Sequence, residues 1–146
     1  MARENKHDTN VYFFDIGGTL GTVELSSQDP LVIKSFTPLP NVGSSLRRLR
    51  SVHRRLGIIS DIGPVTGEAV QQVKSALAGV GLLSAFENEL LLFGTKNSES
   101  IFRTAVATVE SSSRPNACAF VGENPNEREF ALLAGLAALH PAVIIW

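Results

Sequence analysis

The stretch that decides the fold is Val11-Tyr12-Phe13-Phe14-Asp15-Ile16-Gly17-Gly18-Thr19-Leu20. A short, continuous apolar run bounded by a turn is typical of a buried strand, and the two glycines favour a tight turn directly after it. In open α/β sheets, ligands bind beyond the carboxyl ends of the strands. The stretch therefore predicts a central strand that carries the Asp15 carboxylate at its functional end.

The rest of the chain alternates between strand and helix patterns. A β-hairpin is expected from residues 21–25 and 31–36, and further buried strands are expected at 58–59, 90–93, 117–121 and 142–145. Helical spacing of apolar residues predicts four helices, marked by Leu46, Leu49, Val52 and Leu56; by Val70, Val73 and Leu77; by Ile101, Phe102, Ala105 and Val109; and by Phe130, Leu132 and Leu133. Gly57 is expected to end the first of these helices. Non-alternating strands separated by helices predict a parallel sheet that is covered on both faces.

Bulk composition fits one compact domain of 146 residues, with 44% hydrophobic and 18% charged residues. A formal net charge of −1 gives no general attraction to nucleic acid or membranes. The single cysteine, Cys118, lies in an apolar run and is expected to be a buried structural thiol. No stretch approaches the roughly 20 apolar residues that span a bilayer, and the polar residues 1–10 differ from a signal peptide. We therefore expect a cytoplasmic domain over residues 1–146 with a flexible lead-in at 1–10.

Polar residues follow the expected strands in a definite order. The segments that carry them are Asp15-Ile16-Gly17-Gly18-Thr19, Ile58-Ile59-Ser60-Asp61, Thr95-Lys96-Asn97 ahead of Ile101-Phe102, Val121-Gly122-Glu123-Asn124-Pro125-Asn126-Glu127, and Leu133-Ala134-Gly135-Leu136. In this order they resemble the D-x-D-G-T motif, the strand ending in Ser or Thr, the K-P-x-x-x-I-F segment, the V-G-D-x-x-x-D motif and the A-A-G turn of the haloacid dehalogenase-like (HAD-like) hydrolase superfamily. The resemblance implies a Rossmann-like three-layer α/β sandwich, with a parallel sheet between helices, a small β-hairpin flap and no cap domain.

The resemblance also implies a role for each strand-end residue. Asp15 is the expected nucleophile, because the first Asp of the family attacks a phosphoryl group and forms an aspartyl-phosphate. Ser60 and Lys96 are expected to neutralise the non-bridging oxygens of that group. Magnesium is the expected cofactor, and its hard-oxygen ligands are expected to be Asp15, the backbone carbonyl of Gly17, Glu123 and Glu127, with Glu127 acting mainly through metal-bound water.

Two departures from the family pattern predict low activity. Gly17 stands where the family has a second Asp that protonates the leaving group, and loss of a positioned acid/base typically costs about 10²–10⁴-fold in rate. Glu123 and Glu127 stand where Asp is usual, and the extra methylene moves each carboxylate. A catalytically impaired HAD-like domain that serves as a binding or regulatory module is therefore the alternative function. The substrate of an active enzyme would be a phosphorylated small molecule or macromolecule, and another domain or protein is the alternative partner.

Two other interpretations of these residues are open. The Asp15–Thr19 turn followed by a hairpin also resembles the phosphate-binding opening of actin-like sugar kinases, but such kinases need two domains and this chain is short. Arginines 47, 48, 50, 54 and 55 could contact nucleic-acid phosphates. The apolar residues interleaved with them favour a solvated helix face instead, so nucleic acid and membrane are not expected partners. Because the chain ends directly after the last expected strand, the alternative that it is part of a longer protein stays open.

Overall fold

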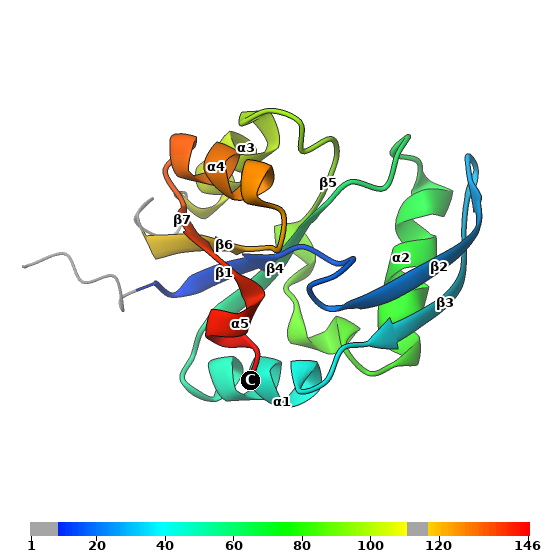
Figure 1. Cartoon of the computed structure of the whole chain (residues 1–146), viewed down its shortest axis with the longest axis horizontal. Helices are drawn as coiled ribbons and strands as arrows, with labels where there is room; N and C mark the ends of the chain where they lie inside the picture. Colours follow the sequence, from blue (N-terminus) through cyan, green and yellow to red (C-terminus); the bar gives the residue numbers. More distant parts are fainter. Residues whose placement is uncertain (1–8, 111–116) are drawn as a thin grey trace, which may run out of the picture.

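A parallel sheet forms the centre of the molecule (Figure 1). The structure, a computed structural model, describes residues 9–110 and 117–146, so residues 1–8 of the predicted lead-in lie outside the described part. The sheet has five strands in the order β5-β4-β1-β6-β7. Their bounds are β1 (Val11–Phe14), β4 (Arg55–Ser60), β5 (Leu91–Phe93), β6 (Cys118–Val121) and β7 (Ala137–Leu139), and every neighbouring pair is parallel. The stretch that opens the sequence thus becomes the central strand, as predicted.

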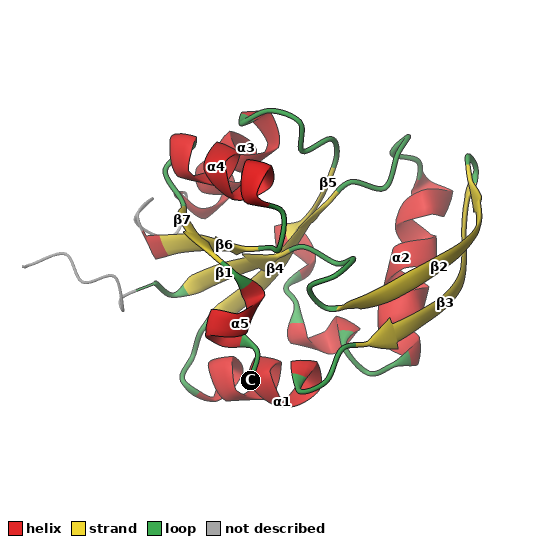
Figure 2. Ribbon diagram, in the orientation of Figure 1, coloured by secondary structure: helices red, strands yellow, loops and turns green. Residues whose placement is uncertain are grey.

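Helices cover both faces of this sheet, which makes a three-layer sandwich (Figure 2). On one face lie α1 (Val42–Ser51), α2 (Gly67–Gly79) and the short α5 (Pro141–Ile144), and on the other lie α3 (Ser100–Glu110) and α4 (Pro125–Leu133). Two short 3-10 helices, η2 (Leu83–Ala85) and η3 (Asn88–Leu90), lead from α2 into β5. The predicted α/β fold class is confirmed.

The core divides into two apolar clusters because successive strand residues point to opposite faces of the sheet. Tyr12 and Phe14 of β1 pack in the cluster shared with α1 and α2. Val11 and Phe13 pack in the cluster shared with α3 and α4. Cys118 is fully buried in this second cluster, and burial raises the pKa of its thiol to about 11. The structure therefore places Cys118 as a core residue.

The hairpin predicted after the first strand consists of β2 (Gly21–Gln28) and β3 (Leu31–Pro38), which pair antiparallel. It forms a separate two-stranded sheet. Figure 1 shows it beside α2, away from the edge strand β7. Ile33 anchors it there, since its backbone N–H donates to Gln72 Oε1 of α2 at 2.9 Å. The hairpin therefore stands over one side of the carboxyl edge of the sheet.

The predicted last strand was wrong, and so was the predicted end of the first helix. The last strand is β7, at Ala137–Leu139, and the segment predicted as a strand at 142–145 is mostly the helix α5. The physical reason is the pair His140-Pro141: Pro141 occupies the first helical turn, where its missing N–H costs nothing, and the His140 side chain accepts from Ala142 N. Short apolar runs do not distinguish strand from helix by themselves.

The first helix also ends earlier than predicted, at Ser51, and β4 already begins at Arg55. Gly57 therefore does not end a helix but lies inside β4, opposite Phe13 of β1. A Cβ at this position would come within 2.5 Å of the backbone oxygen of Leu90. Gly57 is required here because η3 packs closely against the strand.

No helix within residues 9–110 and 117–146 is long and apolar enough to cross a membrane.

Candidate functional site at the carboxyl edge of the sheet

Strand register gathers three predicted site segments at one edge of the sheet. Phe14 of β1 is level with Ile58 of β4 and with Val121 of β6, so the residues that follow these strands emerge side by side. Asp15 continues the pairing, because its backbone N–H donates to Val121 O at 3.0 Å. Parallel strands place their carboxyl ends together, which is where ligands bind in such folds.

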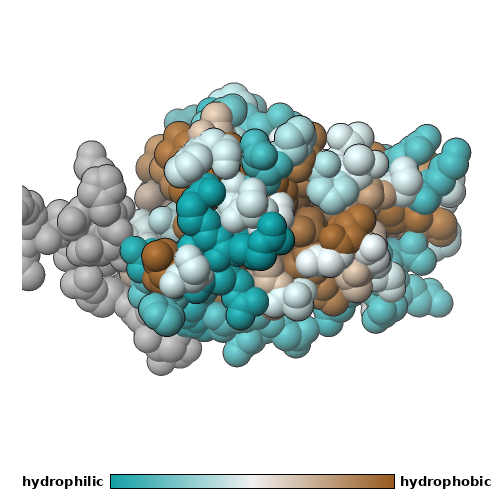
Figure 3. All heavy atoms as spheres, turned by 90° about the horizontal axis from the view of Figure 1, so that it is seen from below, coloured by the Kyte–Doolittle hydropathy of each residue, from teal (hydrophilic) through white to brown (hydrophobic). Residues whose placement is uncertain are grey.

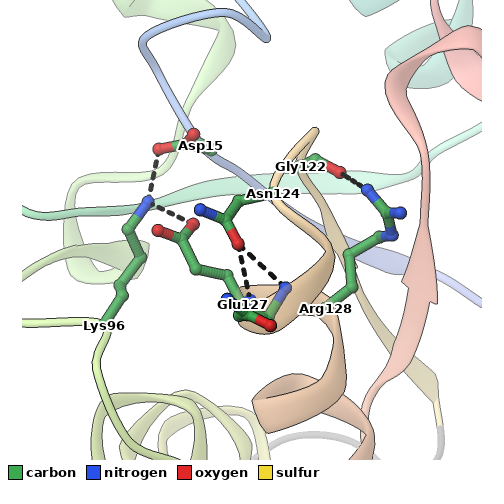
Figure 4. Close-up of polar contacts among 7 residues, drawn as sticks. Asp15, Lys96, Gly122, Asn124, Glu127 and Arg128 are labelled. Atoms are coloured by element: carbon green, nitrogen blue, oxygen red, sulfur yellow. Dashed lines mark hydrogen bonds and ion pairs between the residues drawn. The ribbon is translucent and has the colours of Figure 1, made fainter.

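Lys96 is the centre of the site (Figure 4). Its Nζ lies 2.5 Å from Asp15 Oδ1 and 3.0 Å from Glu127 Oε1. Lys96 is only 6% exposed, although lysine is usually a surface residue. Sequence reasoning predicted that Lys96 and Asp15 would face the same site, and the structure brings them into direct contact.

Glu127 presents its carboxylate to Lys96, and its predicted association with a metal through water stays a prediction. Its Oε1 is within ion-pair distance of Nζ but outside hydrogen-bonding geometry. Among the described residues no group donates a hydrogen bond to this buried oxygen. The ammonium of Lys96 is thus shared between two carboxylates, and the three side chains together keep a net negative charge.

Helix α4 positions Glu127, and the residues that fix this helix were missed by the sequence analysis. Asn124 caps α4, since its Oδ1 accepts from Asn126 N at 2.8 Å and from Glu127 N at 3.2 Å. Arg128 Nη1 donates to Gly122 O at 2.8 Å and so ties the helix to the end of β6 (Figure 4). The signal for the cap was present in the sequence, because Asn followed by Pro is a typical helix start.

Glu123 reaches a different part of the site, the turn that follows Asp15. Gly18 adopts a left-handed φ of +77°, and a Cβ there would lie 2.0 Å from Glu123 Oε1. The Glu123 carboxylate therefore rests directly on the backbone of this turn, in the space that only a glycine leaves free. Glu123 and Asp15 approach the same loop from β6 and β1.

The loop after β1 carries oxygen donors of the kind that magnesium prefers. In the described ranges, no three His, Cys, Asp or Glu side chains lie together as one metal-binding group. Mg²⁺, however, is commonly held by only one or two carboxylates together with water and substrate phosphate. Asp15, Glu123 and the backbone carbonyl of Gly17, which belongs to the same turn, supply oxygens of that kind. These residues fit the ion, and the role of Glu127 through metal-bound water stays a prediction.

Two cavities flank the strand ends, and Asp61 lines both. A polar cavity of about 420 Å³ contains Lys96, Glu127 and three asparagines. A second, largely apolar cavity of about 230 Å³ lies under the hairpin and includes Gly17 and Ser60. Ser60 is buried at the end of β4. The structure thus places Ser60 at the predicted edge, on the hairpin side of the site and not in the Lys96 cluster.

The arginines around α1 make internal contacts. Arg55 forms an ion pair with Glu87 at 2.9 Å, which raises the pKa of its guanidinium. Arg48 donates to Ile144 O at 3.1 Å and lies 3.8 Å from the centre of the Trp146 ring, while Arg50 donates to Ser84 O. Figure 3 views the molecule from below, the side on which α1 lies in Figure 1, and shows hydrophilic residues gathered over part of that face. These three guanidinium groups are therefore held by groups of the same chain, and the predicted absence of a nucleic-acid partner stays a prediction.

Comparisons with known proteins place the fold. No protein-family model and no curated protein matches the sequence. Among solved structures, an uncharacterized protein from Listeria monocytogenes serotype 4b aligns with a TM-score of 0.73 and 16% identity, over 90% of this chain and 77% of that one. The cobalt-bound deoxy-D-mannose-octulosonate 8-phosphate phosphatase of Haemophilus influenzae aligns with a TM-score of 0.59 and 14% identity, over 92% and 71% of the two chains.

A HAD-superfamily hydrolase from Ehrlichia chaffeensis is also similar, with a TM-score of 0.55 and 18% identity, over 73% of this chain and 55% of that one. Identities this low speak for the fold alone. The chain has the HAD-like fold.

Proposed function

We propose that the chain is a phosphohydrolase of the HAD-like type in which Asp15 is the nucleophile. The observation that carries the proposal is the direct contact between Asp15 and a buried ammonium, Lys96, at the carboxyl end of the central strand. A carboxylate at this place can attack phosphorus. Lys96 holds Asp15 by Oδ1 and leaves Oδ2 for the attack.

The proposed reaction has two displacements at phosphorus. In the first, Asp15 Oδ2 forms a bond to phosphorus while the bond from phosphorus to the ester oxygen breaks, and the departing alkoxide takes a proton from water. In the second, water attacks the phosphorus of the aspartyl-phosphate while the bond from phosphorus to Asp15 Oδ2 breaks. Inorganic phosphate leaves, the Asp15 carboxylate is regenerated, and the proton lost by the attacking water neutralises the hydroxide produced in the first step. Lys96 stabilises the charge on the non-bridging oxygens in both steps. Ser60 is proposed to donate a hydrogen bond to the same phosphoryl group.

Magnesium is part of the proposal because of the charge of the site. One ammonium facing two carboxylates leaves the cluster negative, so a phosphate dianion would be repelled without a further cation. Asp15, Glu123 and the carbonyl of Gly17 would hold the ion. When bound, it would supply positive charge to the phosphoryl oxygens.

The experiment is phosphate release from a panel of phosphomonoesters, by wild type and Asp15→Asn, with magnesium and with EDTA. We expect turnover that requires the metal and falls by at least about 10³-fold in Asp15→Asn, since a nucleophile is lost. Asp29→Asn, on the exposed end of the hairpin, is the matched control and should keep full activity. Metal-dependent turnover that survives Asp15→Asn would refute the assignment of the nucleophile.

The second candidate function is a binding or regulatory module, and Gly17 is the observation that favours it. A Cβ at Gly17 would meet no atom within 4 Å, so the position offers room for an acid but has no side chain to supply one. In that case a phosphorylated partner would bind at Lys96 without being hydrolysed. A folded protein that binds phosphomonoesters in the presence of magnesium but releases no phosphate from any of them would support the module.

A further inference from the structure

The apolar cavity under the hairpin is built mainly from apolar side chains that the proposed reaction does not use. Val23 from β2, Ile33 and Phe36 from β3, and Val73 and Ala76 from α2 line it. The bond from Ile33 N to Gln72 Oε1 holds β3 to α2, so the hairpin and the helix form opposite walls of the cavity. A lining of this kind with few polar groups is typical of a pocket for an organic ligand.

The cavity adjoins the proposed reaction site. Gly17, Ser60 and Asp61 form part of its wall, and Gly17 lies two residues after the nucleophile. Lys96 and Glu127, in contrast, line the polar cavity on the other side of Asp61. A molecule whose charged end faces Asp15 and Lys96 would therefore have polar walls on one side and an apolar pocket on the other.

The size of the pocket limits what it can hold. Its volume is about 230 Å³, whereas an apolar cavity of about 150 Å³ is enough to bind benzene in a protein interior. Asp61 is the one ionisable side chain among its described lining residues, and its Oδ1 already accepts from Gly63 N at 3.0 Å. A polyhydroxylated group such as a sugar would lose its hydrogen bonds to water there and find few replacements.

We propose that this pocket receives the organic part of the substrate and selects phosphomonoesters of apolar, ring-sized alcohols over small or polyhydroxylated ones. The inference rests on the proposed function, because it uses the phosphoryl group at Asp15 to orient the ligand. It goes further in assigning the hairpin and α2 as the elements that determine specificity.

The test compares benzyl phosphate with ethyl phosphate, which both release primary alcohols of similar acidity and differ in the ring. We expect kcat/KM of the wild type to be at least about 10-fold higher for benzyl phosphate, as for other apolar groups that enter a fitted pocket. Ala76→Trp, which fills the cavity, should remove most of this preference. Ala78→Trp is the matched control, because Ala78 is exposed on the same helix outside the cavity, and it should retain the preference.

A second variant guards against misfolding of Ala76→Trp. Val23→Thr is nearly isosteric, places a hydroxyl in the pocket, and should lower the ratio of benzyl to ethyl turnover by several-fold. Equal kcat/KM for the two esters in the wild type, with active enzyme, would overturn the pocket assignment while the hydrolase proposal stands.

If no ester is hydrolysed, the two proposals are separated by binding of benzylphosphonate and ethylphosphonate in the presence of magnesium, followed by methyl NMR signals. Tighter binding of benzylphosphonate by at least about 10-fold, with shifts at Ile33 and Val73 that Ala76→Trp abolishes, would support the pocket although the hydrolase has failed. Equal binding, or shifts elsewhere alone, would overturn it.

Discussion

Lys96 is the residue on which the charge of the site depends, because its ammonium is shared by Asp15 and Glu127. All three side chains are largely withdrawn from solvent, with exposed fractions of 5%, 13% and 20%. Removing one member of a buried ion pair leaves its partner charged and uncompensated. The burial of Lys96 is thus consistent with a functional role and also makes the fold depend on it.

We therefore expect Lys96→Met to weaken both the fold and the binding of phosphate. The free energy of unfolding should fall by up to about 3 kcal/mol, because two carboxylates then face each other without a cation. Urea denaturation followed by circular dichroism measures this change, and calorimetric titration with inorganic phosphate and magnesium measures the affinity. Lys34→Met, at an exposed lysine of the hairpin, is the control and should change neither quantity. Unchanged phosphate affinity in Lys96→Met would show that Lys96 is only structural.

At the scale of elements, the start of α4 converts a helix cap into site geometry. The Asn124 side chain accepts two backbone N–H groups of the first turn, one of which belongs to Glu127. The helix begins directly after β6, so the position of the cap decides where the Glu127 carboxylate meets Lys96. The Asn124 cap therefore stabilises α4 and also sets the position of the Glu127 carboxylate.

Replacing the cap should therefore have two effects. Asn124→Ala should lower the free energy of unfolding by about 1 kcal/mol, as is typical for loss of an N-cap. It should also reduce kcat, because Glu127 is displaced and no longer holds the Lys96 ammonium in place. Thr66→Ala is the matched control: Thr66 caps α2 by accepting from Ala69 N, and it lies outside both cavities. Its loss of stability should be similar, and its kcat unchanged. Equal losses of activity in the two variants would contradict a special role for the α4 cap.

At the scale of the whole molecule, one thin sheet joins two apolar clusters. Leu46 of α1 belongs to the cluster on one face and Phe102 of α3 to the cluster on the other, and both are almost completely buried. Each strand of the sheet contributes side chains to its two faces, so loss of packing on one face removes support from the other. The molecule should behave as a single cooperative unit.

Phe102→Ala and Leu46→Ala test whether the two faces of the sheet unfold cooperatively. We expect losses of about 3–5 and 2–5 kcal/mol, respectively, from removal of large buried side chains. The single tryptophan, Trp146, reports on the α1 side, where its ring packs over Arg48. In both variants the urea midpoints from tryptophan fluorescence and from helical circular dichroism should coincide. A shift of the dichroism midpoint alone in Phe102→Ala would indicate that the two layers unfold separately.

The sequence by itself determined the central strand, the hairpin, the alternation of helices and strands, and the edge at which the polar residues gather. These features depend on local patterns: a continuous apolar run, helical spacing and glycine turns act over a few residues. The same local evidence failed at Gly57 and at 142–145. Close packing against Leu90 decided the first case, and the helix start at His140-Pro141 decided the second.

Only the tertiary structure decided which groups each of the polar residues contacts. Sequence order placed Glu123 and Glu127 in one expected metal set, four residues apart. In the folded chain, Glu123 lies over the Gly18 turn and Glu127 pairs with Lys96. The pocket under the hairpin likewise combines side chains from β2, β3 and α2 that no single segment contains. The physical reason is that ion pairing and cavity shape depend on distances between segments far apart in the chain, and these distances are set when the helices and the hairpin pack against the sheet.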